Sequence, residues 1–469
     1  MPFVAGVDSS TQATKVEIRD LDSGEIVAAT SSPHPVVTAP RSEQDPRSWW
    51  AAFQDAWTQA TAALPARASI VGISVAGQQH GMVALDDIGD PIHAAKLWND
   101  TESADDADRL IERLGGPMTW ARAVGSVPVA AFTVTKLSWL HRSHPDAWSR
   151  LARVVLPHDY LTHRLTGAFT TDRGDASGTG YWSPATGAYR WDILELIDAE
   201  RDWADVVPTV LGPLEVAGEW DGMPVAVGTG DNMAGALGLG LRPGDATISI
   251  GTSGTAFAVA DAATADPTGA VAGFADATGR FLPLVCTSNA AKVLDAFARL
   301  LGVDHDEFDR LALAAVGEDR PLVLPYFDGE RTPNRPDARG VLAGLRSDVA
   351  REDVARAAVD GVACGLLDAL DALRAFAAVD GTLILTGGGS RSRALQAVIA
   401  GLVDLPVVVA AVDQAVASGA AVQAAAVAAG VDHAAIQQRW GLGVGSAASE
   451  PCESGDLRQR YAALRDARS

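Results

Sequence analysis

Residues 7–11, Val-Asp-Ser-Ser-Thr, and residues 250–254, Ile-Gly-Thr-Ser-Gly, decide the fold of this chain. Each stretch is a loop of small polar residues between two runs of β-forming residues, so each predicts a strand–loop–strand unit. The four expected strands are residues 3–8, 14–19, 245–250 and 255–260. Because the pattern recurs far downstream, we interpret it as an internal repeat and predict two domains of one α/β architecture.

The junction between the two predicted domains lies at residues 237–244, where residues 241–244, Leu-Arg-Pro-Gly, supply a turn. This division gives one domain at residues 1–240 and another at residues 241–469. A chain of 469 residues is long enough for two such domains, each with its own core.

A third loop of small residues, Gly387-Gly388-Gly389-Ser390, follows a strand expected at residues 382–386. All three loops present backbone N–H groups after a strand, an arrangement that binds phosphate and other anions. Each loop alone is also an ordinary turn, but three in one chain favour a nucleotide site. The P-loop and dinucleotide-binding patterns are absent from the sequence.

The composition excludes several classes of function. The chain is 48% hydrophobic and 20% charged, and its 37 basic and 59 acidic residues give a net charge of −22. This charge repels nucleic acids and anionic membranes, so we expect neither as a partner. Three distant cysteines predict no disulfide framework, and the start of the chain lacks the basic region of a signal peptide. We therefore expect a soluble cytoplasmic protein.

Two aspartates follow predicted strands and are candidates for chemistry. Asp8 ends the first strand, where a carboxylate can hold Mg²⁺ through water; the alternative is a turn or cap residue. Asp231 follows Gly228-Thr229-Gly230, and a carboxylate exposed by such a turn can accept the proton of an attacking hydroxyl. Its alternative is a solvated loop residue.

Two polar segments have compositions that suit a sugar. Gln79 and His80 follow a strand expected at residues 70–76, and amide and imidazole groups can recognise hydroxyls. Trp98 offers an apolar plane beside Asn99 and Asp100. A structural histidine and a core tryptophan are the alternatives.

The motifs, in their order along the chain, resemble the FGGY family of carbohydrate kinases, and most of all its members that act on D-xylulose. The resemblance covers nearly the whole chain. The matching motifs are residues 6–12 (GVDSSTQ), 77–81 (GQQHG), 97–100 (LWND), 156–161 (LPHDYL), 230–232 (GDN), 249–254 (SIGTSG), 329–333 (GERTP) and 387–389 (GGG).

The resemblance implies two ribonuclease-H-like (actin-like ATPase) domains with a central cleft, the sugar against the first domain and ATP against the second. It implies transfer of a phosphoryl group from ATP to the 5-hydroxyl of D-xylulose with Mg²⁺ as cofactor, and it leaves a homodimer open. Asp231 matches the general base, and Asp8 the catalytic carboxylate associated with the metal, which the two aspartates would share.

The same resemblance assigns two further sets of residues. The sugar-binding set is Gln79, His80, Trp98, Asp231 and Asn232. The ATP-binding set is Thr11, Gln12, Lys15, Gly251, Thr252, Gly388 and Gly389.

Two departures from the family pattern keep the sugar open. Gln79 stands where several relatives have Met, and Glu102 stands where relatives often have Arg. A kinase for another ketose or polyol, such as ribulose, erythritol or gluconate, is therefore the nearest alternative. An actin-like or heat-shock-like ATPase that phosphorylates no sugar is a further alternative, but it leaves Trp98 and His80 without a purpose.

Overall fold

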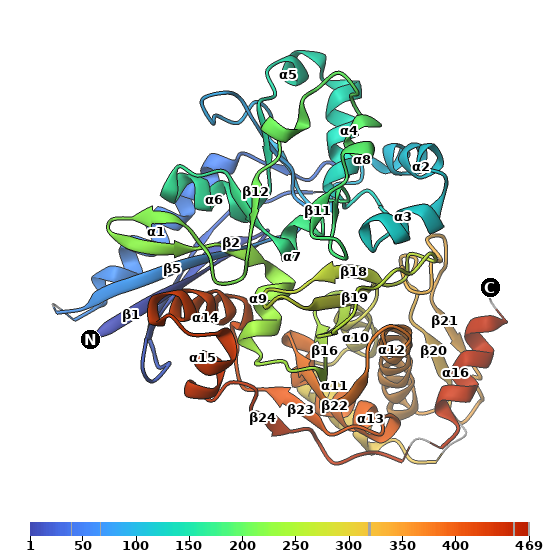
Figure 1. Ribbon diagram of the computed structural model, residues 1–469. Helices are drawn as coiled ribbons and strands as arrows, with labels where there is room; N and C mark the ends of the chain where they lie inside the picture. The colour runs from blue at the N-terminus through green and yellow to red at the C-terminus, as the bar shows by residue number, and fades with distance from the viewer. Residues whose placement is uncertain (39, 66, 318–319, 454, 468–469) are drawn as a thin grey trace. The chain divides into compact units, whose positions relative to one another are not determined.

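The computed structural model describes residues 1–38, 40–65, 67–317, 320–453 and 455–467 (Figure 1). The chain forms two compact units, and neither is continuous in sequence. The first contains Met1–Leu241, Asp261–Leu282 and Gln414–Gly443, and the second contains Arg242–Ala260, Pro283–Asp413 and Val444–Ser469. The first change of unit coincides with the expected junction near residue 240. Two later segments return to the first unit, which the contiguous domains 1–240 and 241–469 did not anticipate.

The first unit is built on a seven-stranded sheet in the order β13-β14-β5-β1-β2-β3, with β15 paired to β5. Strands β1, β2 and β3 are antiparallel, and β5 runs parallel to β1. The strands are β1 (Pro2–Ser9), β2 (Ala13–Asp20), β3 (Ile26–Pro33), β5 (Ser69–Gly77), β13 (Val216–Trp220), β14 (Met223–Ala226) and β15 (Thr229–Gly230).

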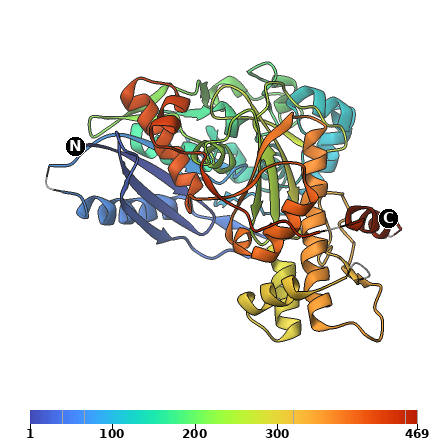
Figure 2. The same ribbon diagram turned by 90° about the horizontal axis from the view of Figure 1, so that it is seen from below.

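Helices cover both faces of this sheet (Figure 2). Helix α1 (Pro46–Ala62) begins at Pro46 after the cap Asp45, whose side chain accepts a hydrogen bond from the N–H of Arg47. It buries Trp49, Phe53 and Ala56, which recur at helical spacing. Helix α14 (Ala415–Ala429) packs on β1 and β5, and also on α9 (Asp231–Gly238).

Glycines let α14 approach its neighbours closely. A Cβ atom on Gly6 of β1 would lie 2.0 Å from the carbonyl oxygen of Ala417, and one on Gly419 would lie 1.8 Å from that of Ala234 in α9. Both distances are far shorter than van der Waals contact, so only glycine fits there. The Ala-rich composition of residues 415–431 therefore reflects backbone-to-backbone packing against the sheet.

The second unit repeats this order of strands. Its sheet runs β19-β17-β16-β22-β23-β24, with β16, β17 and β19 antiparallel and β22 and β23 parallel to β16. Three antiparallel strands followed by a parallel one is also the order β3-β2-β1-β5. The strands are β16 (Gly244–Ile250), β17 (Gly254–Ala258), β19 (Phe281–Thr287, of which residues 283–287 belong to this unit), β22 (Val379–Thr386), β23 (Val407–Ala410) and β24 (Gly445–Ala447).

The remaining elements complete each unit. In the first unit they are β4 (Glu43–Gln44), β6 (Val83–Leu85), β7 (Ala95–Lys96), α2 (Ala104–Arg113), α3 (Pro117–Val124), α4 (Thr133–Ser143), α5 (Pro145–Ser149), β8 (Arg153–Val155), α6 (Pro157–Thr166), β9 (Thr170–Asp172), α7 (Arg173–Ala176), β10 (Trp182–Ser183), β11 (Ala188–Tyr189), α8 (Trp191–Glu195), η1 (Trp203–Asp205), β12 (Thr209–Leu211), β18 (Ala272–Ala275) and α15 (His433–Arg439). In the second they are α10 (Ala291–Leu301), α11 (His305–Ala314), β20 (Leu322–Leu324), β21 (Val341–Ala343), α12 (Arg351–Arg374), η2 (Gly388–Arg391), α13 (Arg393–Leu402) and α16 (Leu457–Asp466).

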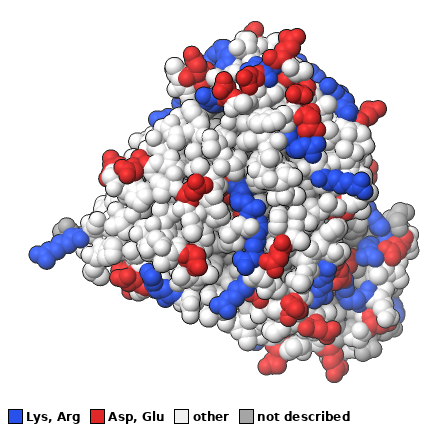
Figure 3. Space-filling view, viewed as in Figure 1, with Lys and Arg blue, Asp and Glu red and all other residues white. Residues whose placement is uncertain are grey.

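Acidic and basic side chains are mixed on the face drawn in Figure 3, with wide uncharged areas between them. Within the described residues, no single helix has the length and apolar character needed to cross a membrane; one pair, Ala415–Ala429 with His433–Arg439, passes by length and composition but is bent by 109°.

We predict that Gly419→Ala destabilises the first unit, because its new Cβ must displace the Ala234 carbonyl in a close-packed contact. Overpacking of this kind costs about 1–3 kcal/mol, so the thermal midpoint should fall by several degrees. Gly235→Ala is the control: it is also helical, but a Cβ there meets nothing within 4 Å. Equal midpoints for the two variants would contradict this view of the α9–α14 contact.

Candidate active site

Asp8 is held at the end of β1 by its pairing with β2. It lies opposite Lys15 in the strand ladder, and the Lys15 ammonium lies 3.3 Å from Asp8 Oδ2. Burial raises the pKa of Asp8, and Lys15 offsets part of that rise. The other carboxylate oxygen, Oδ1, is buried and has no hydrogen-bond partner among the described residues. A buried anionic oxygen without a partner is suited to a cation or a water bound to one.

Asp231 is brought next to Asp8 by strand register. Within the parallel ladder, Asp8 pairs with Ala76 of β5, and Ala76 pairs with Thr229 of β15. Asp231 then begins α9, two residues after Thr229. Neighbouring strands lie about 4.8 Å apart, so the ends of β1 and β15 reach the same edge of the sheet on either side of β5.

The carboxyl of Asp231 has a raised proton affinity. Although the residue is partly exposed, loss of hydration raises its pKa to about 7, with added repulsion from Asp8 and Asp175. Asn232 Nδ2 donates to Asp231 Oδ1 at 2.9 Å, which fixes the orientation of the carboxylate. Asp231 therefore has the position and the pKa of a group that can take up a proton near neutral pH.

Gln79 and His80 turn from the end of β5 toward Asn232. Asn232 Nδ2 donates to Gln79 Oε1 at 2.7 Å, while the buried Nε2 of Gln79 has no partner within the described part of the chain. His80 adopts φ = 65°, an uncommon backbone conformation for a residue other than glycine. Its ring stacks on Phe132 at 4.9 Å, and its Nδ1 lies 2.7 Å from the carbonyl oxygen of Gly178.

Trp98 is 38% exposed and is tied to the first loop. Its Nε1 donates to Thr11 Oγ1 at 3.0 Å, and Thr11 Oγ1 donates to Gln78 Oε1 at 3.0 Å. The hydroxyl of Thr11, which was expected beside ATP, thus bonds to Trp98, one of the residues expected to contact the sugar. Gln12 is exposed, and Lys15 Nζ also donates to Gln414 at 2.9 Å.

A buried ion-pair network anchors the segment that carries Trp98. Lys96 Nζ lies 3.0 Å from Glu43, 3.0 Å from Asp100 and 2.7 Å from Glu102. The three carboxylates lie close enough together to resemble a metal site, but Lys96 already supplies the cation. Burial opposes the charge on Lys96, yet the three acidic partners raise its pKa. Glu102 thus belongs to an ion-pair network that its sequence position alone did not predict.

In the second unit, the other two loops meet at the ends of adjacent parallel strands. β16 pairs with β22, so the loop at Gly251–Ser253 and the turn at Gly387–Gly389 lie at one edge of the sheet. A Cβ atom on Gly389 would lie 2.5 Å from Ile250 Cγ2, whereas one on Gly388 would meet nothing within 4 Å. The structure therefore brings together the four residues Gly251, Thr252, Gly388 and Gly389, with open space beside Gly388.

The motif at residues 329–333 braces the first of these loops. The buried carboxylate of Glu330 accepts hydrogen bonds from the N–H of Ser288 (2.5 Å) and from Asn289 Nδ2 (2.9 Å). The next N–H, that of Ala290, donates to the carbonyl oxygen of Thr252. Glu330 therefore holds the segment that contacts the Gly251–Ser253 loop.

Sequence reasoning missed a buried cluster behind Asp231 and His80. His158 Nδ1 lies 2.8 Å from Asp175, and its Nε2 lies 3.0 Å from Asp159 and 3.8 Å from Asp172. Burial opposes protonation of His158, but Asp159, Asp175 and Asp172 outweigh it and raise the pKa of His158 to about 9. The only sequence signal was the motif at residues 156–161, whose partners lie in a different segment.

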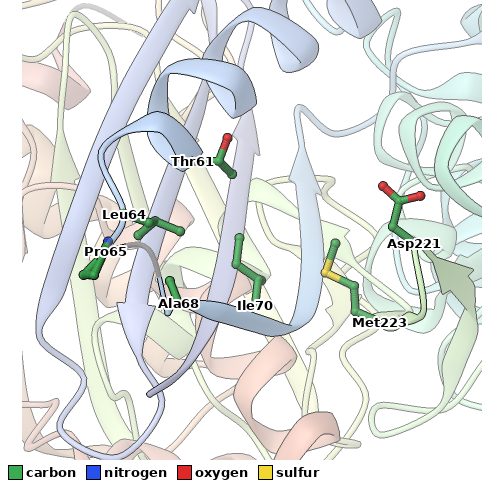
Figure 4. A pocket seen from close by; sticks show the side chains of 7 residues that line it. All are labelled: Thr61, Leu64, Pro65, Ala68, Ile70, Asp221 and Met223. Carbon is green, nitrogen blue, oxygen red and sulfur yellow. The ribbon is translucent and has the colours of Figure 1, made fainter.

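A separate pocket of about 440 Å³ lies at the start of β5 (Figure 4). Its lining residues are Thr61, Leu64, Pro65, Ala68, Ile70, Asp221 and Met223. Asp221 is their single titratable side chain, and none of them is a predicted site residue. The chemistry-bearing residues are at the opposite, carboxyl end of β5.

Both halves of the chain match the same protein family. The N-terminal domain of the FGGY family of carbohydrate kinases matches residues 3–238, and the C-terminal domain matches residues 246–428. A xylulose kinase of Streptomyces coelicolor is 47% identical over 454 residues, covering 95% of this chain and 92% of that protein. A xylulose kinase of Escherichia coli is 34% identical, covering 85% and 84%.

Solved structures of related proteins have the same fold as this chain. The crystal structure of xylulose kinase from Bifidobacterium adolescentis is 39% identical, with a TM-score of 0.89 and coverage of 99% of both chains. The expected α/β fold of the ribonuclease-H-like (actin-like ATPase) type is confirmed.

We predict that stability depends on pH through His158. Between pH 6.5 and 9 the unfolded chain has lost the His158 proton while the folded chain keeps it, so the free energy of unfolding falls as pH rises. Relative to His158→Asn, the thermal midpoint of the wild type should therefore decline across this window. The comparison with the variant removes the opposite contribution of Lys136, whose pKa burial lowers to about 7. His433→Asn is the control, because burial lowers the pKa of His433 to about 4 and keeps it neutral throughout. An unchanged pH dependence in the His158 variant would refute this assignment.

Proposed function

Because the chain belongs to the FGGY family of carbohydrate kinases and is therefore a sugar phosphotransferase, we propose that it transfers the γ-phosphoryl group of ATP to the 5-hydroxyl of D-xylulose. The observation that carries this proposal is the hydrogen-bonded row Gln79–Asn232–Asp231 at the edge of the sheet that Asp8 also reaches. The choice of D-xylulose rests on the relatives that carry the name xylulose kinase. Because the chain belongs to a family of sugar kinases, an ATPase that phosphorylates no sugar is disfavoured as the alternative function.

Asp231 is the proposed general base. Phosphoryl transfer asks the protein chiefly to position the reactants and to stabilise charge, and the attacking hydroxyl must lose a proton. With a pKa of about 7, the Asp231 carboxyl can accept that proton without holding it too weakly or too strongly near neutral pH. Asn232 keeps the carboxylate oriented while this occurs.

Asp8 and Asp231 fit a magnesium ion. Both present carboxylate oxygens, the ligand type that Mg²⁺ prefers, and Asp8 Oδ1 is a buried oxygen without a described partner. When bound, Mg²⁺ would neutralise part of the phosphate charge. Lys15 favours the ionised form of Asp8 through its 3.3 Å ion pair and so offsets part of the rise in pKa that burial causes.

The sugar would lie against the first unit. Gln79 Nε2 is a buried donor with no partner among the described residues and is suited to a hydroxyl, and the strained turn at His80 presents the imidazole beside it. Trp98 supplies an apolar plane whose orientation is set by Thr11. We propose this positioning role for Thr11, in addition to the expected one beside ATP. Gln12 and Lys15 remain proposed residues of the ATP site.

The nucleotide would lie against the second unit. Gly251 and Thr252 offer backbone groups at the end of β16, and Gly388 and Gly389 offer them at the end of β22. The backbone can approach a phosphate or ribose closely where no side chain intervenes.

Replacement of Asp231 tests the mechanism. Asp231→Asn should lower turnover by about 10²-fold or more, the scale of a lost acid–base group, while D-xylulose binding followed by tryptophan fluorescence stays close to wild type. Asp55→Asn is the control, because it removes an equal charge from an exposed position on α1. Turnover within a few-fold of wild type in the Asp231 variant would exclude it as the base.

A panel of sugars tests the substrate. ADP release should give the highest kcat/KM with D-xylulose, compared with D-ribulose, erythritol and gluconate. A tenfold higher value for one of the other three would overturn the proposed substrate and leave the family assignment intact.

Gly388 tests the nucleotide site. Gly388→Val should raise the KM for ATP while the thermal midpoint and sugar binding remain unchanged, because the new side chain would enter open space rather than the protein. An unchanged KM for ATP would place the nucleotide elsewhere.

A further inference from the structure

The proposed chemistry uses none of the side chains of the buried cluster. The cluster consists of one histidine and three aspartates: His158, Asp159, Asp172 and Asp175. They lie in and around the segment formed by α6, β9 and α7 of the first unit. Burying several charges is costly unless each has a partner, so a cluster of this kind calls for an explanation.

One part of the cluster holds the strand that leads into Asp231. Asp172 caps α7 with hydrogen bonds from the N–H groups of Gly174 (2.8 Å) and Asp175 (2.9 Å). The same carboxylate accepts a hydrogen bond from Thr229 Oγ1 at 2.7 Å. Thr229 is fully buried and lies two residues before Asp231. Packing at this point is tight, because a Cβ on Gly174 would lie 3.0 Å from Thr229 Oγ1.

A second part holds the turn at His80. The backbone N–H of His80 faces the Asp175 carboxylate and offsets part of the burial that raises the pKa of Asp175. The backbone carbonyl of Asp175 also accepts a hydrogen bond from the N–H of Gly178 at 2.9 Å. Two residues past α7, the carbonyl oxygen of Gly178 lies 2.7 Å from His80 Nδ1. The φ of 65° at His80 is unfavourable for a side-chain-bearing residue and persists only where its surroundings fix it.

His158 holds the Asp175 carboxylate in place through its Nδ1 atom, which lies 2.8 Å from that carboxylate. Its ring lies between Asp175 and Asp159. Two glycines make room for the residue: a Cβ on Gly77 would lie 2.8 Å from the backbone nitrogen of His158, and one on Gly228 would lie 2.8 Å from Cδ2 of its ring. His158 therefore packs against the end of β5 and the residue before β15, the two strands that lead to the turn at His80 and to Asp231.

We propose that Asp172 and Asp175, with His158 behind them, are positioning residues: Asp172 fixes Asp231 through Thr229, and Asp175 fixes the sugar-contacting turn through the backbone of His80. This proposal rests on the function proposed above. It assigns separate effects to the two aspartates, Asp172 acting on the chemical step and Asp175 on sugar binding.

The Asp172 contact is tested with an isosteric pair at Thr229. Thr229→Val keeps the shape and removes the hydroxyl, whereas Thr229→Ser keeps the hydroxyl. We expect Thr229→Val to lower kcat by about tenfold with little change in either KM, since misplacement of a catalytic group slows the chemical step. Thr229→Ser should stay near wild type. Equal kcat for the two variants, per folded molecule, would overturn this part of the proposal.

The Asp175 contact is tested with Asp175→Asn. An amide keeps one acceptor oxygen but presents N–H groups toward His158 and toward the backbone N–H of His80, so the turn should lose its fixed position. The KM for D-xylulose should rise by about three- to tenfold, the scale of one hydrogen bond, while the KM for ATP remains unchanged. A loss of folded protein with both KM values unchanged would indicate a merely structural role and would overturn this part. Because the two variants lie on different segments, failure of one to fold leaves the other as a test.

Asp231→Asn separates this proposal from the one on which it depends. If Asp231→Asn retains turnover, the proposed function fails, whatever the Thr229 and Asp175 variants do. If Asp231→Asn is inactive but Thr229→Val equals Thr229→Ser and Asp175→Asn leaves the KM for D-xylulose unchanged, the proposed function stands and the positioning proposal fails.

Discussion

The parallel pairing of β1, β5 and β15 is the constraint on which the candidate site depends. Asp8, Ala76 and Thr229 are in register across three strands, so Asp8 and the segment that starts with Asp231 end at one edge of the sheet. Backbone hydrogen bonds set this register, and a one-residue slip would reverse the direction of every side chain. Gln79 and His80 extend from the central strand of the three, between the two carboxylates. A sheet thus fixes groups that come from three distant stretches of sequence.

The negative charges of the candidate site are partly compensated by neighbouring basic side chains. Burial raises the pKa of Asp231, and repulsion from Asp8 and Asp175 adds to that rise. Lys15 counters this on the β1 side, and His158 counters it behind the strand ends. The arrangement keeps carboxylates in a poorly hydrated place without fully neutralising them, which suits a centre that must handle a proton and a highly charged phosphate.

The strands, the three loops and both domain sheets could be predicted because their signals are local. Small polar loops between β-forming runs mark Asp8, Gly251 and Gly388 directly in the sequence. Gln79 and Asp231 stand out because each follows a predicted strand, and the family resemblance supplied their roles. The partners of His158 could not be predicted, since Asp172 and Asp175 lie in another segment and no periodic pattern links them. The family resemblance assigned Thr11 to ATP, and the hydrogen bonds of its hydroxyl with Trp98 and Gln78 could not be foreseen, because these residues lie far from Thr11 in the sequence.

The return of residues 414–443 to the first unit has a consequence for biosynthesis. Helix α14 packs on one face of β1 and β5. These two strands therefore leave the ribosome long before the helix that covers them. Until α14 is synthesised, the apolar face of β1 and β5 that it covers stays exposed. Chains halted before residue 414 therefore present this face to aggregation or to chaperones. Completion of the first unit is thereby coupled to translation through residue 443.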